Sequence, residues 1–182
     1  MIPLVTHTPR LMLLAASRAL LTAELHKPQY FPVLLGAALP ADWPPGQYDR
    51  EAMHYFLEQL TDGGRTAAGW FGWYALHKAT AEAPRTLIGA GGFMGPPDAA
   101  GVVEIGYSIA ADWRGQGLAQ ELVAGLVQQA ADTGMVRHLI AHTDADNLAS
   151  QQVLLRNGFA RGVPVSDGRL RFERPVEPTP AA

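Results

Sequence analysis

A glycine-containing turn between a strand pattern and a helix pattern constrains this chain more than any other feature. The segment 114–119 reads Arg-Gly-Gln-Gly-Leu-Ala; it follows an apolar, partly alternating run at 102–109 and precedes an amphipathic stretch that reaches about residue 131. The first backbone N–H groups of a helix lack partners, and the helix dipole places positive charge at the same end. Glycine, which has no Cβ, lets such a backbone approach an oxyanion closely. The turn therefore predicts a site for a phosphate or pyrophosphate.

Two common phosphate-binding motifs do not fit this turn. A dinucleotide-binding fold requires Gly-x-Gly-x-x-Gly at its first strand–helix turn, whereas here Gln120 stands in place of the third glycine and the turn comes late in the chain. The Gly-Lys-Ser/Thr ending of a nucleoside triphosphate loop is absent as well. Taken alone, the two glycines are also consistent with an ordinary tight turn.

Composition narrows the class of protein. The 182 residues, 48% of them hydrophobic and 17% charged, are sufficient for one domain with a real core. A net charge of −3 gives no electrostatic reason to expect nucleic acid or an acidic membrane as partner. The chain has no cysteine, which excludes disulfides, thiolate metal sites and a cysteine nucleophile and fits a cytoplasmic location. The apolar run at 11–16 is too short to span a membrane.

Hydrophobic periodicity and turn residues predict an α/β domain with a mixed sheet. Ser17 and Asp49 are placed to cap helices over 18–25 and 50–60, the second ending at Gly63-Gly64. Further helices are expected at a short proline-flanked segment, at 117–131 and at 147–156. Strands are expected at 11–16, 68–76, 85–93, 102–109, 138–143, 161–165 and 169–174. We expect one domain over 1–174 and a flexible tail over 175–182.

Three motifs in the second half resemble the GNAT superfamily of acyl-CoA-dependent N-acyltransferases, and most closely the branch that contains the ribosomal-protein-alanine N-acetyltransferases. The resemblance is carried over residues 101–160, whereas residues 1–100 match only in element order. The motifs are Glu104-Ile105-Gly106-Tyr107, Arg114-x-x-Gly117-x-Ala119, and Asn147-x-x-Ser150-x-x-Val153-Leu154-x-Arg156-x-Gly158-Phe159.

The resemblance implies a mixed sheet of about seven, mostly antiparallel strands, flanked by about four helices, with the fourth and fifth strands splayed into a V. It implies acetyl-CoA as acyl donor, held by residues 101–174, and an acceptor side built from residues 1–100, with no metal. In that V the pantetheine arm would pair with the β-strand backbone and the pyrophosphate would meet the helix N-terminus. The implied cofactor-binding residues are Ser108, Ile109, Ala110, Arg114, Gly115, Gln116, Gly117, Leu118, Ala119, Asn147 and Ser150.

Catalysis requires removal of a proton from the acceptor, because an alkylammonium with a pKa of ~10.4 is not a nucleophile. Glu104 is the predicted base, directly or through a water, although it is also a plausible surface carboxylate. His142, near the end of a strand, is a second candidate. A strand N–H near Ile109 is placed to stabilise the oxyanion.

The departing thiolate needs a proton or a hydrogen bond. Many superfamily members carry a tyrosine seven residues after the asparagine, but this chain has Leu154 there, so its general acid is not identified. We expect Ser150 to donate a hydrogen bond to the sulfur and Tyr107 to belong to the core. With no cysteine and no serine beside an evident base, direct attack in a ternary complex is expected.

The acceptor is not identified by the sequence: a peptide N-terminus, an amino acid or a small amine each fit. Tyr30, Trp43 and Tyr48 lie in a proline-rich region and are candidates for the acceptor pocket, or else cover the sheet as ordinary core. The oligomeric state is left open by the sequence; dimers are common among the proteins it resembles, so a homodimer is one arrangement to test. Two alternatives remain: a non-catalytic acyl-CoA-binding or sensing module, and an acetylating toxin acting on aminoacyl-tRNA, which the lack of a basic patch disfavours.

Overall fold

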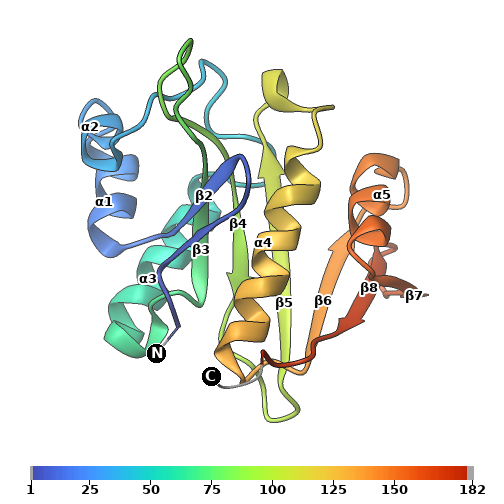
Figure 1. Ribbon diagram of the computed structural model, residues 1–182. Helices are drawn as coiled ribbons and strands as arrows, with labels where there is room; N and C mark the ends of the chain where they lie inside the picture. Colours follow the sequence, from blue (N-terminus) through green and yellow to red (C-terminus); the bar gives the residue numbers. More distant parts are fainter. Residues whose placement is uncertain (1, 180–182) are drawn as a thin grey trace.

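One sheet of eight strands organises the chain. In the computed structural model, which describes residues 2–179, the strands lie in the order β1-β2-β3-β4-β5-β6-β8-β7, and only β5 and β6 are parallel (Figure 1). The predicted mixed fold is confirmed, with one three-residue edge strand, β1, that the sequence analysis did not include. The strands are β1 (Val5–His7), β2 (Leu11–Ala15), β3 (Phe71–His77), β4 (Thr86–Met94), β5 (Val102–Ile109), β6 (His138–Thr143), β7 (Ala160–Pro164) and β8 (Leu170–Pro175).

The helices begin at the caps that the sequence indicated. Ser17 Oγ accepts from the N–H of Leu20 at 3.2 Å, and Asp49 Oδ1 accepts from the N–H of Ala52 at 2.9 Å. The end expected at Gly63-Gly64 is only a break: Gly64 adopts φ 54° and ψ −132°, and a further turn follows to Ala67. The helices are α1 (Arg18–His26), α2 (Phe31–Leu35), α3 (Arg50–Ala67), α4 (Leu118–Thr133) and α5 (Leu148–Arg156), with a 3-10 turn at Ala111–Trp113.

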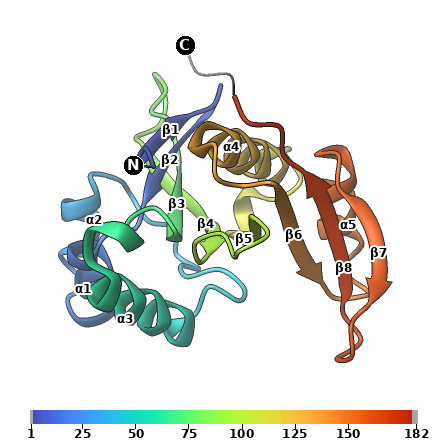
Figure 2. The ribbon, with the colours of Figure 1, turned by 90° about the horizontal axis from the view of Figure 1, so that it is seen from below.

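The first three helices and α4 cover opposite sides of the sheet, as Figure 2 shows. The inward stripe predicted for α4, Leu118, Leu122 and Leu126, is buried, and α4 packs on β1, β2 and β5. On the other side α3 packs on β3 and on α1. Burying these apolar faces on both sides holds the sheet as the middle layer. Fully buried side chains include Tyr74 and Leu76 of β3, Ile88 and Phe93 of β4, and Phe31 of α2, which packs on Tyr74.

The two parallel strands separate after a short contact. β5 and β6 pair only where Val102–Glu104 lies beside His138–Ile140. Beyond that point β5 continues to pair with β4 through Ile109, while β6 continues with β8 through Thr143. Their facing edges therefore part toward the carboxyl ends of both strands. This is the V predicted between the fourth and fifth expected strands, which are β5 and β6 once β1 is counted.

The chain end returns to α4. The N–H of Val176 donates to the carbonyl of Arg137, and the hydroxyl of Thr179 donates to Asp132 Oδ1 at 2.7 Å. Pro175, where the flexible tail was expected to begin, is the last residue of β8. Residues 180–182 of that predicted tail lie outside the described residues. Within residues 2–179, no helix is both long enough and apolar enough to cross a membrane.

Candidate functional site

A groove opens where β5 and β6 part. Its volume is about 590 Å³, and its walls come from residues 105–109 of β5, 113–115 and 117–120 before and at the start of α4, 141–144 at the end of β6, and residues of α5 with its cap Asn147. Gln116, predicted as a cofactor-binding residue, is not among the lining residues. Gly46 and Gln47 add a short wall from the loop that precedes α3. Two helix N-termini and two unpaired strand edges therefore face one cavity.

The glycine turn presents unpaired donors to this groove. Gly115 and Gly117 have φ values of 74° and 77°, which the turn requires and which side chains disfavour. Within residues 2–179, no hydrogen bond engages the N–H groups from Gly115 to Ala119. The side chain of Leu118 is buried in the core, so its backbone alone faces the groove. This is a helix N-terminus suited to an anion.

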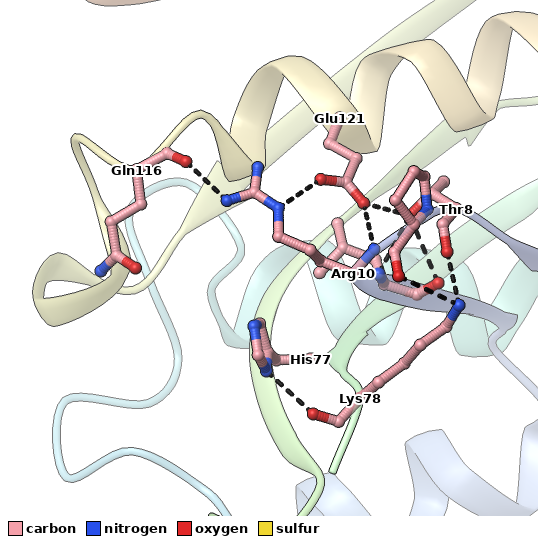
Figure 3. A network of polar contacts seen from close by, with 8 residues as sticks. Thr8, Arg10, His77, Lys78, Gln116 and Glu121 are labelled. Carbon is pink, nitrogen blue, oxygen red and sulfur yellow. Dashed lines mark hydrogen bonds and ion pairs between the residues drawn. The ribbon is translucent and has the colours of Figure 1, made fainter. Parts of the chain in front are cut away.

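Arg10, in the turn between β1 and β2, holds the glycine turn from behind (Figure 3). Its Nη1 donates to the carbonyl of Gln116 at 2.8 Å, and its Nε lies 2.7 Å from Glu121 Oε2. Glu121 Oε1 accepts from the Thr8 hydroxyl and from the Arg10 N–H, each at 2.6 Å. Partial burial raises the pKa of Glu121, but these donors and the guanidinium charge outweigh it, and the net pKa lies below its usual value. Sequence reasoning missed Arg10, because nothing local links it to a turn 106 residues away.

The free edge of β5 offers fewer groups than expected. The N–H of Ala110 donates to Ile88 O at 2.8 Å, so this predicted ligand contact is already paired within the sheet, which corrects the expectation for its amide. Backbone groups alternate between the two edges of a strand. The N–H of Ile109 therefore faces the groove, and that of Ser108 faces β4. The carbonyl of Ile109 accepts from Arg114 Nε at 2.9 Å, which ties the strand end to the glycine turn.

The two base candidates are paired with each other. Glu104 Oε1 lies 2.7 Å from His142 Nδ1, across the last residues where β5 and β6 are still together. The Glu104 side chain is 39% exposed and that of His142 is 12% exposed. His142 lines the groove, whereas Glu104 stands behind it. Both residues were predicted from the sequence as candidate bases, but the contact between them was not.

The start of α5 brings three site residues together. Asn147 Oδ1 accepts from the N–H of Ser150 at 3.1 Å, so it caps the helix while it lines the groove. Ser150 Oγ lies 2.9 Å from Tyr107 Oη, and both residues line the groove. Tyr107, which was expected in the core, is partly buried and packs against it, and it also lines the groove. Leu154, where many relatives of this type carry tyrosine, is fully buried.

The three candidate acceptor rings lie away from the groove. Tyr30 is 60% exposed at the start of α2, beside a separate shallow cavity. Trp43 Nε1 donates to Glu24 Oε1 at 2.8 Å, and the Tyr48 hydroxyl donates to Glu24 Oε2 at 2.8 Å. From this region, Gly46 and Gln47 line the groove instead. The aromatic residues hold the loop that carries these two.

The comparison with protein families decides the class. A model described as "Acetyltransferase (GNAT) domain" matches residues 20–160. The chain belongs to the GNAT acetyltransferase family. An uncharacterized N-acetyltransferase of Bacillus subtilis (strain 168), YjdG, is 32% identical over 125 residues, which cover 69% of this chain and 71% of that relative.

Solved structures agree with this GNAT fold over nearly all of the chain. RimL, a ribosomal-protein α-N-acetyltransferase solved in complex with coenzyme A, has a TM-score of 0.66 at 20% identity and covers 97% of this chain and 98% of its own. The microcin C7 self-immunity acetyltransferase MccE, in complex with acetyl-CoA and AMP, has a TM-score of 0.59 at 19% identity, with coverage of 93% and 94%.

GNAT enzymes use acetyl-CoA as acyl donor, and the groove of this member fits such a ligand. Its diphosphate requires unpaired donors at a helix N-terminus, which Gly115 to Ala119 supply, and its amide-containing arm requires a free strand edge, which β5 supplies at Ile109. Among residues 2–179, no group of three or more His, Asp or Glu side chains is placed to hold a metal ion.

Proposed function

We propose that this GNAT protein is an N-acetyltransferase that moves acetyl from acetyl-CoA directly to a primary amine. The observation that carries the proposal is the groove itself: one cavity joins an anion-binding helix start, a free strand edge and the imidazole of His142, which is paired with the Glu104 carboxylate. Bound acetyl-CoA supplies an activated thioester. The chain's own residues bind it, orient it and accept the amine's proton.

For donor binding, we assign the backbone of Gly115 to Ala119 to the pyrophosphate and the N–H of Ile109 to the arm. Asn147 and Ser150 line the same groove and lie toward the reactive end in this arrangement. Arg114 is fixed to the strand through Ile109 and adds positive charge beside the turn. Fixing these donors before the ligand arrives lowers the ordering cost of binding.

For proton transfer, we assign Glu104 and His142 as one unit. Glu104 is the base that the sequence favours, and its 2.7 Å contact fixes the orientation of His142, which lines the groove. A proton taken from the ammonium at His142 or through a water is then stabilised by the Glu104 carboxylate. The 2.7 Å contact makes the two side chains one hydrogen-bonded unit beside the groove.

The acceptor is a primary amine that reaches the groove past Gly46 and Gln47. A peptide N-terminus, an amino acid and a small amine remain the classes to test. RimL is named for a ribosomal protein and MccE for microcin immunity, so acceptors of different size occur within similar folds. We place the protein in the cytoplasm, which its lack of cysteine fits.

The first test is calorimetric titration with acetyl-CoA, with CoA and NAD as comparators. The unmodified protein should bind acetyl-CoA and CoA but not NAD. Gly117→Val should abolish that binding, because the left-handed turn is strained by a branched side chain and the donors move. Gly134→Val is the matched control: it has φ 65° at the other end of the same helix and open space around it.

Retained affinity in Gly117→Val, with Gly134→Val unchanged, would contradict the assignment of the phosphate site. Absence of binding by the unmodified protein would remove the enzyme proposal. Once binding is shown, an amine panel monitored by release of free thiol identifies the acceptor class. Binding without thiol release for any amine would support the alternative of a non-catalytic sensing module.

A further inference from the structure

Tyr107 has a hydroxyl at the groove that the chemistry proposed above does not use. Its Oη lies 2.9 Å from Ser150 Oγ and 3.2 Å from the carbonyl oxygen of Ser150, so either oxygen is within reach of its one hydrogen. Tyr107 comes from β5 and Ser150 from the first turn of α5, elements that stand on the two walls of the groove. The contact therefore bridges the cavity at the end of the strand edge where the donor's reactive group is expected.

We propose that Tyr107 is a positioning residue: its phenolic hydrogen is donated to Ser150 Oγ, so that the Ser150 hydrogen points into the groove toward the departing sulfur. The inference rests on the proposed function, because a leaving sulfur is present only if the groove holds an acyl-CoA. It adds to that function a defined source for the hydrogen bond that stabilises the thiolate.

The hydrogens and lone pairs of the two hydroxyl groups support this arrangement. Burial raises the pKa of Tyr107 to about 12, so its hydroxyl stays protonated over the physiological range and always has one hydrogen to donate. A serine hydroxyl has one hydrogen and two lone pairs. When Tyr107 occupies a lone pair of Ser150 Oγ, the hydrogen of Ser150 is left for the groove. In the reverse arrangement, Tyr107 donates its hydrogen to the carbonyl of Ser150 and the Ser150 hydroxyl donates to Tyr107 Oη. The Ser150 hydrogen would then not be available to the groove.

The pair acts as a hydrogen-bond donor rather than as an acid. A thiol has an ordinary pKa of about 8.5, well below that of Tyr107, so transfer of the tyrosine proton to the thiolate is unfavourable. When the carbon–sulfur bond breaks, its electron pair stays on sulfur, and the thiolate accepts a hydrogen bond from Ser150. The proton that finally makes the thiol comes from solvent. The positive end of the α5 dipole lies at the same place and favours the same anion.

This arrangement gives a role to a difference from the family pattern. Many superfamily members carry a tyrosine seven residues after the asparagine, and here Leu154 occupies that position and is fully buried. No hydroxyl can reach the groove from it. Tyr107 brings a phenol to the groove from the opposite wall, and Ser150 carries its effect to the sulfur.

The test measures binding and needs no acceptor. CoA and desulfo-CoA, which lacks the sulfur, are titrated calorimetrically from about pH 6 to about pH 9. A site that stabilises the thiolate binds CoA increasingly better than desulfo-CoA as the pH rises. Tyr107→Phe and Ser150→Ala should each reduce this pH-dependent gain about tenfold, the loss expected for a hydrogen bond to a charged group. Because the two residues form one unit, the double variant should lose no more than either single variant.

Affinity for desulfo-CoA should be unchanged in Tyr107→Phe, since phenylalanine preserves the packing of the ring. Tyr55→Phe is the matched control, an exposed tyrosine on α3 far from the groove in sequence and fold. Three results would overturn the inference: a pH-dependent gain retained by Tyr107→Phe, a gain larger than that of the unmodified protein, or an equal loss of affinity for both ligands. If the unmodified protein binds neither ligand, the proposed function fails together with the inference, and that outcome is distinct from the other three.

Discussion

At the residue scale, the Glu104–His142 contact is the feature with the most direct chemical consequence. Two groups that can each accept a proton lie 2.7 Å apart where β5 and β6 begin to separate. Their position follows from the parallel register of three residue pairs, because Glu104 is the last residue of β5 that still faces β6. The proposed base is therefore placed by the same geometry that opens the groove.

Glu104→Gln should lower kcat at neutral pH by roughly 100-fold or more, with the Kd for acetyl-CoA unchanged, because the variant removes proton acceptance and leaves the donor site intact. The measurement is steady-state release of free thiol with an identified amine, followed over pH. Glu173→Gln, a change at an exposed strand carboxylate in β8, is the control. An unaltered rate and pH profile in Glu104→Gln would leave His142 to act without the carboxylate.

The contacts of some site residues could not be predicted from the sequence alone. Glu104, Ser150 and Asn147 were selected by motif spacing, and the structure places Ser150 and Asn147 at the groove with Glu104 directly behind His142. Tyr107 was assigned to the core because alternation along a strand does not reveal that a neighbouring strand turns away. A side chain whose contact lies 43 residues along the chain is identified only after the elements are packed.

At the scale of elements, the loop before α3 is held by one buried carboxylate. Glu24 on α1 accepts from Trp43, from Tyr48 and, at 2.6 Å, from the hydroxyl of Tyr74. Burial raises the pKa of Glu24, and it also raises the pKa of both tyrosines well above their usual value, so all three donors keep their hydrogens. The network fixes the loop that places Gly46 and Gln47 at the groove.

Glu24→Gln should lower the free energy of unfolding by about 1–3 kcal/mol, because an amide offers one acceptor oxygen where three donors are buried. The measurement is urea denaturation at neutral pH. Glu58→Gln, at an exposed site on α3, serves as the control. We also expect faster hydrogen exchange over residues 42–48 in Glu24→Gln. Equal stability of the two variants would show that the tyrosine hydroxyls find other partners without cost.

Element boundaries were predicted best where the sequence carries residues that end a helix or a strand. The strands β5 and β6 match the predicted ranges at both ends, and α4 ends at Gly134, which adopts φ 65°. β1 was missed because three residues are too few for an alternating pattern. The double glycine ends the first helical segment of α3 as predicted, whereas the further turn that reaches Ala67 beyond the break at Gly64 was not predicted.

At the scale of the whole molecule, the first ten residues complete a site formed mainly by the second half. The contact of Arg10 with Gln116 joins the β1–β2 turn to the start of α4, and Glu121 connects the same turn through Thr8. No local sequence pattern predicts the contact between Arg10 and Gln116, which lie 106 residues apart. The sequence therefore identified the glycine turn, while its support came only with the tertiary structure.

The Glu121 contacts predict an acid-sensitive contribution to stability. The pKa of Glu121 is lowered in the folded state from an unfolded value of 4.5, so its stabilising effect is fully present above that pH and is lost as the pH falls through the lower, folded value. Unmodified protein should be more stable than Glu121→Gln by about 1 kcal/mol between roughly pH 6 and 7. That difference should shrink below about pH 4.

Urea denaturation across this pH range makes the comparison, with Glu82→Gln, in an exposed turn, as the control. A difference between unmodified protein and Glu121→Gln that does not change with pH would show that the hydroxyl and backbone donors, rather than the ionised carboxylate, account for the stabilisation.

The loop before α3, which Glu24 holds through Trp43 and Tyr48, also bears on how the acceptor of such a protein changes in evolution. Gly46 and Gln47 line the groove where we propose that the acceptor enters, and the Glu24 hydrogen bonds to Trp43 and Tyr48 do not involve the turn or the helix starts assigned to the donor. After gene duplication, changes confined to this loop would let one copy accept a new amine while both copies keep the same acyl donor. We therefore expect sister proteins to diverge first around residues 42–48 and last around residues 114–119.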